Sequence, residues 1–192
     1  MRSERDDIVL SRIRALLDAS RGQEWAYRTR PRLVESDLLA WEALHGLALP
    51  EGYRVFLHEV SNGGMMPGSY CDFIVKPLTE VRGGVSAAKP FPVTADRLRQ
   101  RFRQLKTEGR PADGVLFPEL EAFWKEFDQP LGCLVFGQYP SGDALFLVTA
   151  GDLRGSVWCG VCCGIPEMDP SGEPVEFLDW FADVLAEFEG GA

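Results

Sequence analysis

The chain has 192 residues, of which 45% are hydrophobic, 11% aromatic and 26% charged. These values are typical of an average globular protein and exclude a disordered or low-complexity chain. The length suits one domain, since most domains hold about 100 to 150 residues. The 29 acidic residues outnumber the 20 basic residues and give a net charge of −9. This charge opposes binding to a polyanion, so the sequence predicts no nucleic-acid partner.

The sequence predicts neither a membrane span nor a secretion signal. The longest apolar stretches, near residues 131–136 and 144–150, are far shorter than the roughly 20 residues that cross a bilayer. The N-terminal residues alternate charged and apolar side chains and lack the pattern of a signal peptide. An odd number of cysteines, five, in a chain of this size favours a reducing compartment. We therefore expect a cytoplasmic protein without a membrane partner.

The first third of the chain is predicted to form three helices. Apolar residues at three- and four-residue steps predict an amphipathic N-terminal helix over residues 6–20. Ser36 is expected to cap a second helix that ends at Gly46. Pro50 suits the first turn of a third helix, because proline lacks the N–H that would have no partner there. Asn-Gly-Gly at residues 62–64 should end this helix in a tight turn.

Strands and further helices are predicted in the rest of the chain. A sheet is expected to begin at residues 70–75, with a short helix or turn at residues 77–84. Thr94 should cap an Arg-rich helix that ends near Leu105. A short helix at residues 119–127, an antiparallel meander and a C-terminal helix at residues 174–188 complete the chain. The strands of the meander are expected at residues 132–136, 143–148 and 155–161.

These elements predict an α+β fold. Residues 1–192 should form a single domain, with an antiparallel-dominated mixed sheet flanked by helices. The sequence contains neither an internal repeat nor a stretch typical of an interdomain linker.

Residues 44–64 resemble the signature of the SUKH superfamily, of the Smi/Knr type. That signature is a helix ending near glycine, a Leu-Pro step, a helix with a Tyr-Arg pair and aromatic residues, and a closing Asn-Gly-Gly. The matching residues are Leu49, Pro50, Tyr53, Phe56, Leu57, Asn62, Gly63 and Gly64. The resemblance covers residues 37–188, with its signature region at 37–64. The Arg-rich segment 85–119 is longer than the family suggests and is interpreted as an insertion.

The signature residues are expected to have structural roles. Pro50 starts a helix, Tyr53 and Phe56 should be buried, and residues 62–64 tolerate a positive φ in a sharp turn. What the resemblance implies is function, because bacterial proteins of this family are commonly immunity proteins that bind and neutralise a cognate toxin, often a nuclease. Other members are regulatory interaction proteins.

Groups suited to catalysis are scarce in the sequence. His45 and His58 are the only histidines, and His58 lacks the second histidine of a zinc-protease motif. We therefore expect no enzyme activity, no metal and no cofactor. The alternative is a zinc or thiol site in a cysteine cluster that lacks a matching second pair. Its residues are Cys159, Cys162 and Cys163, with Cys133 and Cys71 as further ligands.

Charge is unevenly distributed along the chain. Residues 82–110 contain eight basic and two acidic residues, whereas residues 155–192 contain eight acidic residues and no Lys or Arg. One interpretation is a solvated face of the C-terminal helix, formed by Glu176, Asp179, Asp183 and Glu187 and compensated by the Arg-rich helix. The other is an acidic surface that attracts a basic protein and imitates nucleic-acid phosphates. Its predicted residues are Glu167, Asp169, Glu173, Asp143 and Asp152.

The sequence and the resemblance together predict a non-catalytic protein-binding module, an immunity protein whose partner is a cognate toxin. The alternative is a cytosolic regulatory or scaffold protein of the same family. A small thiol- or metal-dependent enzyme is a third hypothesis.

Overall fold

The computed structural model of the chain describes residues 3–67, 72–81, 84–109, 117, 131–160 and 165–190. Its α-helices are α1 (Glu4–Ala19), α2 (Glu35–His45), α3 (Glu51–Glu59), α4 (Ala95–Thr107) and α6 (Phe177–Gly190), and two 3-10 helices are η1 (Leu78–Glu80) and η2 (Gly84–Ala88). The strands are β1 (Arg28–Thr29), β2 (Gly64–Met66), β3 (Phe73–Val75), β4 (Cys133–Gln138), β5 (Ala144–Val148), β6 (Val157–Cys159) and β7 (Ile165–Pro166).

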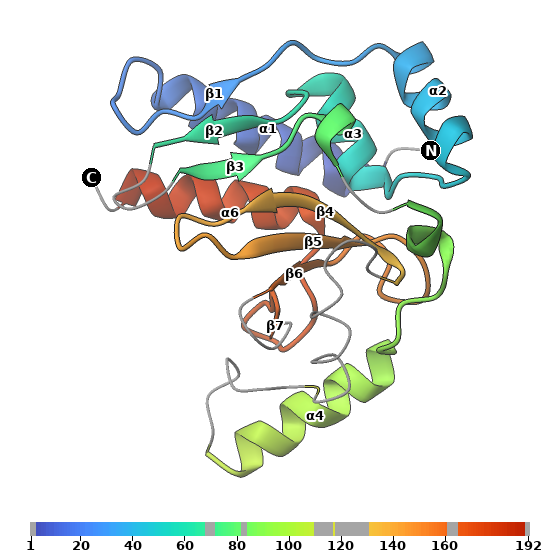
Figure 1. Ribbon diagram of the computed structural model, residues 1–192. Helices are drawn as coiled ribbons and strands as arrows, with labels where there is room; N and C mark the ends of the chain where they lie inside the picture. Colours follow the sequence, from blue (N-terminus) through green and yellow to red (C-terminus); the bar gives the residue numbers. More distant parts are fainter. Residues whose placement is uncertain are drawn as a thin grey trace.

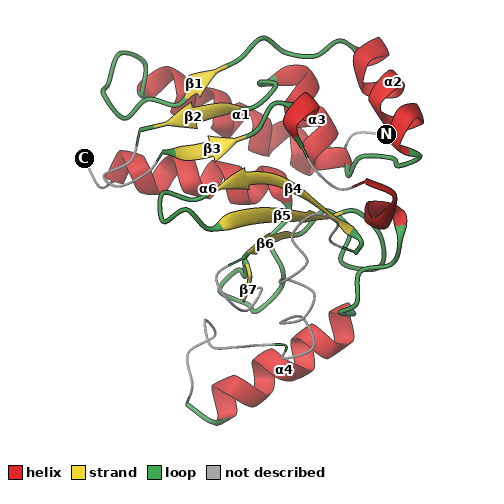
Figure 2. Ribbon diagram, in the orientation of Figure 1, coloured by secondary structure: helices red, strands yellow, loops and turns green. Residues whose placement is uncertain are grey.

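The seven described strands form one sheet in the order of the sequence. Each neighbouring pair among them is antiparallel. Figure 1 shows α1, α3 and α6 gathered along one part of the sheet and α4 apart from them, beyond β7. Figure 2 shows the strands one below another from β1 to β7, with α1 and α6 beside the upper strands and α4 below β7. The predicted α+β fold with an antiparallel-dominated sheet flanked by helices is confirmed, although the described strands include no parallel pair that would make the sheet mixed.

Side chains of the central strands alternate between two hydrophobic clusters, as the two-residue period of a strand requires. The first cluster contains Leu134, Phe136, Leu145, Leu147 and Val157 together with residues of α1, α3 and α6. The second cluster contains Cys133, Val135, Phe146, Val148 and Trp158 together with residues of α4. Both faces of the central sheet are therefore covered by apolar groups.

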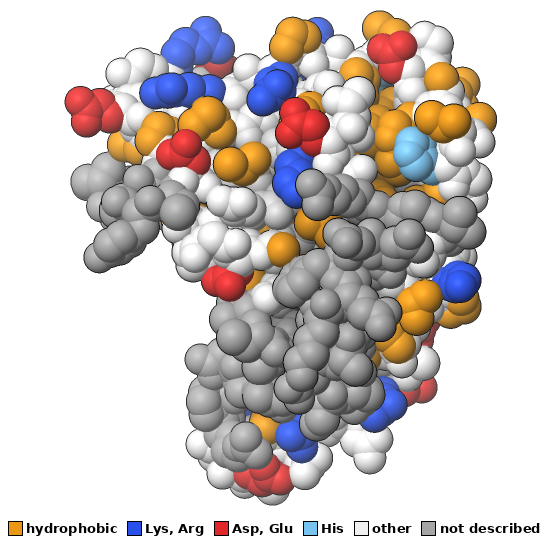
Figure 3. All heavy atoms as spheres, in the orientation of Figure 1, with side chains coloured by type: hydrophobic (Ala, Val, Ile, Leu, Met, Phe, Trp, Pro, Cys, Tyr) orange, Lys and Arg blue, Asp and Glu red, His pale blue; other side chains and the backbone are white. Residues whose placement is uncertain are grey.

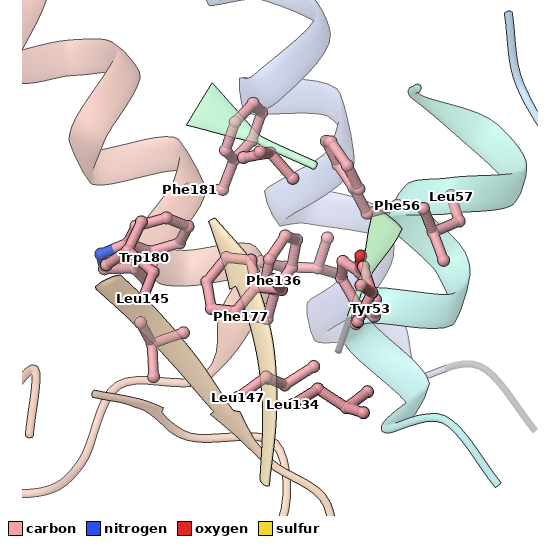
Figure 4. Close-up of a cluster of buried hydrophobic side chains, with 14 of the residues drawn as sticks. Tyr53, Phe56, Leu57, Leu134, Phe136, Leu145, Leu147, Phe177, Trp180 and Phe181 are labelled. Carbon is pink, nitrogen blue, oxygen red and sulfur yellow. The ribbon is translucent and has the colours of Figure 1, made fainter. Parts of the chain in front are cut away.

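Aromatic rings from α3, β4 and α6 form the centre of the first cluster (Figure 4). Phe56 and Phe181 are fully buried, and their ring centroids lie 4.8 Å apart in an edge-to-face arrangement. Tyr53 lies 4.8 Å from Phe177 in a similar arrangement, and Phe136 lies 5.3 Å from Phe177. Such edge-to-face pairs are favourable because the positive ring edge meets the negative ring face. These contacts fix α3 and α6 against β4.

The second cluster places α4 on the other face of the sheet. Leu98 and Leu105 of α4 are buried, at a spacing of two helical turns. The ring of Phe91, just before the helix, lies 4.9 Å from the ring of Trp158 on β6. Trp158 also donates a hydrogen bond of 3.1 Å from Nε1 to Oγ of Ser156. The Arg-rich helix is thus part of the core and not an appendage.

Helix α6 packs beside α1 through two ion pairs. Arg5 contacts Asp179 at 2.9 Å, and Arg12 contacts Asp183 at 2.8 Å. Two of the four acidic residues of the expected solvated helix face therefore have basic partners on α1. Asp179 is half-buried, and its pKa is raised because burial opposes the charged carboxylate.

Two helix starts differ from the prediction, and one agrees. Helix α2 begins at Glu35, so the prediction that Ser36 caps it is wrong; Val34 occupies the extended N-cap position and makes no side-chain cap. Helix α1 begins at Glu4, because the Ser3 hydroxyl accepts a hydrogen bond from the Asp6 N–H and the Asp6 carboxylate accepts one from the Ser3 N–H. The Thr94 cap of α4 is confirmed.

The sheet begins earlier than predicted. β1 and β2 precede the expected first strand, and their backbones pair at Thr29 and Gly64. β3, at Phe73–Val75, lies inside the expected strand 70–75, and the three strands expected for the meander correspond to β4, β5 and β6. The short helix expected at residues 119–127 lies outside the described residues.

Candidate functional site

The apolar residues of the signature are part of the core. Tyr53 and Phe56 are fully buried and Leu49 is almost so, as predicted. Pro50 is the N-cap of α3, one position before its expected place in the first turn. Arg154 holds this segment to the sheet, since its guanidinium donates hydrogen bonds to the carbonyls of Leu49, at 2.6 Å, and Thr149, at 3.1 Å.

The Asn-Gly-Gly triplet connects α3 to the sheet. Asn62 Oδ1 accepts a hydrogen bond of 2.8 Å from the Leu78 N–H, and Gly63 has φ +75°, as the prediction of a sharp turn requires. Gly64 differs from that prediction, because it lies in β2 and has no positive φ. A Cβ at Gly64 would collide with the carbonyl of Arg28 on β1. Close approach of two strands, and not a turn, explains this glycine.

Both histidines donate to backbone carbonyls. Nδ1 of His45 lies 2.8 Å from the carbonyl oxygen of Trp41, and its ring stacks on the Trp41 ring with centroids 4.0 Å apart. Nδ1 of His58 lies 3.0 Å from the carbonyl oxygen of Leu33. Since a carbonyl oxygen only accepts, each Nδ1 carries a proton. His45 therefore holds to the backbone of its own helix, and His58 holds α3 to the loop at Leu33.

Three of the predicted acidic residues lie on one turn, residues 167–173, which we call the acidic turn. Asp169 organises it: its Oδ1 accepts hydrogen bonds from the Ser171 N–H at 2.8 Å, the Ser171 hydroxyl at 2.6 Å and the Glu173 N–H at 3.0 Å. The Ser171 hydrogen bond is the main reason that the pKa of Asp169 is lowered. The turn therefore holds an ionised carboxylate at neutral pH.

Glu167 belongs to a partly buried hydrogen-bond chain. Its Oε1 accepts from the Tyr139 hydroxyl at 2.8 Å, and that hydroxyl accepts from Trp180 Nε1 at 3.0 Å. Burial raises the pKa of Glu167, because the charged carboxylate loses contact with water. Glu167 is thus less available to a partner than Asp169 or Glu173. No sequence pattern links Tyr139 and Trp180 to Glu167, so sequence reasoning missed these two residues.

Two residues of the predicted acidic surface, Glu173 and Asp152, contact the basic helix α4. Arg99 Nε donates to both carboxylate oxygens of Glu173, at 2.8 and 3.0 Å. Asp152 accepts a hydrogen bond of 3.0 Å from the Ala95 N–H, at the first residue of α4. A carboxylate there also interacts favourably with the positive end of the helix dipole. α4 therefore contacts two of the five residues predicted for the acidic surface. The first interpretation expected it to compensate the face of the C-terminal helix, but Asp179 and Asp183 of that face pair with α1 instead.

Asp143 lies in the turn between β4 and β5. Its backbone carbonyl accepts a hydrogen bond of 2.9 Å from the Tyr139 N–H. Tyr139, at the other side of this turn, reaches Glu167. The structure thus brings Glu167, Asp169 and Glu173 together on the acidic turn. Asp143 lies on the turn between β4 and β5, which contacts the acidic turn through Tyr139. Asp152 lies at the start of α4.

Two cysteines of the predicted cluster are not described by the structure. Cys162 and Cys163 lie outside the described residues, as does Cys71. Cys133 and Cys159 are buried, and burial raises the pKa of the Cys133 thiol. No group of three His, Cys, Asp or Glu residues suited to a metal ion occurs in the described part of the chain.

Glu167→Gln tests the buried position of this carboxyl. A raised pKa in the folded state means that folding stability falls as pH rises from the ordinary Glu pKa of about 4.3 through the folded value. Glutamine keeps the oxygen that Tyr139 bonds and has no charge to desolvate. The stability of the variant relative to the native protein should therefore increase between about pH 4 and about pH 7. Thermal melts across this range measure it, with exposed Glu176→Gln as control; a difference that does not change with pH contradicts the prediction.

Comparisons of this chain with protein-family models, curated proteins and solved structures gave no match. The resemblance to the SUKH superfamily stays a prediction from the sequence. Among the described helices, none combines the length and the apolar character that a membrane crossing requires.

Proposed function

We propose that this chain is a non-catalytic protein-binding module that binds and neutralises a cognate toxin in the cytoplasm, as its resemblance to the SUKH superfamily implies. The observation that supports the proposal is the acidic turn. It lies within residues 155–192, which include eight acidic residues and no Lys or Arg. The core positions of Tyr53 and Phe56 are compatible with it, because the signature then builds the scaffold and leaves binding to the surface.

The contact between Arg99 and Glu173 supports a basic partner. It demonstrates that a guanidinium can reach both oxygens of this carboxylate, which is about half exposed. An arginine of a toxin could replace Arg99 in the same geometry. A nuclease is a suitable partner, because its substrate-binding surface must attract phosphates and is therefore basic.

The identity of the partner is tested by capture. The immobilised 192-residue chain is incubated with lysate of the source organism, and bound proteins are identified and expressed. The proposal expects a basic protein that arrests growth when expressed alone and no longer does so when this chain is co-expressed. A bound protein without toxicity would support the regulatory alternative and overturn the immunity function.

The role of the acidic surface is tested with neutral substitutions of nearly the same shape. The variant Asp143→Asn, Asp169→Asn and Glu173→Gln removes three charges, and Asn at 169 retains an acceptor for the turn. We expect its association rate constant with the toxin to fall about 10-fold at low salt, since steering by charge contributes 10-fold or more. The matched control removes three exposed charges elsewhere: Glu24→Gln, Asp37→Asn and Glu80→Gln.

The comparison between the two variants decides the question. An unchanged association rate for the control and a reduced one for the test variant, both at equal net charge, support a local acidic surface. Equal effects in both variants, or an association rate independent of salt, would remove the acidic surface from the proposal.

A further inference from the structure

The outward side of α4 carries a row of basic residues. Arg99, Arg103 and Lys106 follow one another at four- and three-residue steps, so they lie on one face of the helix. The burial of Leu98 and Leu105 fixes the rotation of the helix and turns this face outward. We call it the basic row. Figure 3 shows blue Lys and Arg side chains at the lower end of the molecule, where Figure 1 places α4.

Two residues of the basic row, Arg103 and Lys106, are available to bind carboxylates. Arg99 is paired with Glu173, whereas Arg103 uses only its Nε, which donates to the backbone carbonyl of Arg99 at 3.2 Å. Within the described part of the chain, neither Arg103 nor Lys106 lies within ion-pair distance of an acidic residue. Both side chains are exposed. Two cations thus continue a row whose first member already holds a carboxylate.

A small hollow lies beside the row. It has a volume of about 280 Å³ and lies between α4 and the acidic turn, lined by Arg99, Phe102, Arg103, Ser171, Gly172 and Glu173. The hollow combines an apolar wall, the Phe102 ring, with two guanidinium groups. A side chain with an apolar stem and a terminal carboxylate fits this combination of groups.

We propose that the basic row docks an acidic segment of a protein partner, with carboxylates on Arg103 and Lys106 and a side chain in the hollow. A protein segment suits the surface better than nucleic acid. Glu173 lines the hollow, and the whole chain has a charge of −9, so a continuous phosphate backbone would be repelled. In a short acidic segment only the side chain in the hollow approaches Glu173, and Arg99 already holds that carboxylate in an ion pair. This surface is opposite in charge to the acidic turn and does not depend on the proposed toxin.

The proposal is tested by binding of a fluorescent Glu-rich peptide to the full chain, measured by anisotropy at low salt. Arg103→Glu with Lys106→Glu should weaken binding at least about 10-fold, as loss of close charge pairs does. The control, Arg21→Glu with Arg28→Glu, has the same net charge and changes exposed residues away from α4; its affinity should stay within about twofold of native. Arg103→Gln with Lys106→Gln replaces the reversal if thermal melts show that the reversed variant is unfolded.

Glu173→Gln provides a second, independent arm. Because it releases Arg99 from its carboxylate, it should bind the Glu-rich peptide about threefold more tightly, in line with the strength of an exposed ion pair. The same substitution should weaken binding of a basic toxin, so failure of one proposal can be told from failure of the other. The inference is overturned by absence of peptide binding, by equal loss in the row and control variants, or by tighter binding of a duplex DNA than of the peptide.

Discussion

Replacing Phe56 with alanine is expected to lower the free energy of unfolding by about 3–5 kcal/mol. The ring is fully buried between α3 and α6, with the Phe181 centroid at 4.8 Å and the Phe177 centroid at 5.2 Å. Its removal leaves a cavity that these rings cannot fill without shifting a helix. Chemical denaturation followed by circular dichroism measures the loss.

The matched control for Phe56 is Leu44→Ala on α2. Leu44 is 81% exposed, so its truncation should change stability by no more than about 0.5 kcal/mol. Tyr53→Ala should resemble Phe56→Ala, since Tyr53 is also fully buried. Unchanged denaturation midpoints for both core variants would mean that the signature helix is a binding element and not part of the scaffold.

Gly63→Ala is expected to destabilise the protein by about 3 kcal/mol or more. Two costs add at this position. Gly63 has φ +75°, which a side chain opposes, and an added Cβ would lie 2.5 Å from the Val75 carbonyl oxygen and 2.6 Å from the carbonyl carbon of Lys76. Because those atoms are backbone in and next to β3, they cannot move away without disturbing the sheet.

Gly46→Ala separates these two costs. Gly46 has a similar φ of +60° at the end of α2, but nothing lies within 4 Å of an added Cβ. Its alanine variant should lose only the conformational part, about 1–2 kcal/mol. Equal losses at both positions, measured by thermal denaturation, would refute the role of close packing at Gly63.

Helices were the most predictable part of the fold. Their apolar spacing and the Gly46 end identified α1, α2, α3, α4 and α6, although boundaries moved by one to three residues at caps such as Ser3. β1 was not predictable, because its two residues, Arg28 and Thr29, are both exposed and show no alternation. β2 was missed because Gly64 suggests a turn in the sequence and serves close strand contact in the structure.

The candidate site was predictable in its charge and not in its contacts. The lack of Lys and Arg in residues 155–192 identified the acidic turn directly. The partners of its side chains are far apart in the chain: Arg99 is 74 residues from Glu173, and Ala95 is 57 residues from Asp152. No local spacing rule reports such pairs, because only the packing of α4 on the second cluster brings them together.

The two-sided burial of the central strands constrains how this protein can diverge from its relatives. In the segment between β3 and β4, described residues such as Phe91, Leu98 and Leu105 cover Val135, Phe146 and Trp158, which are neighbours on β4, β5 and β6. A homologue without that segment would expose these positions to water, where large apolar side chains promote aggregation. Loss of the segment in evolution should therefore be accompanied by polar residues at these three positions, while Leu134 and Phe136 on the opposite face stay apolar.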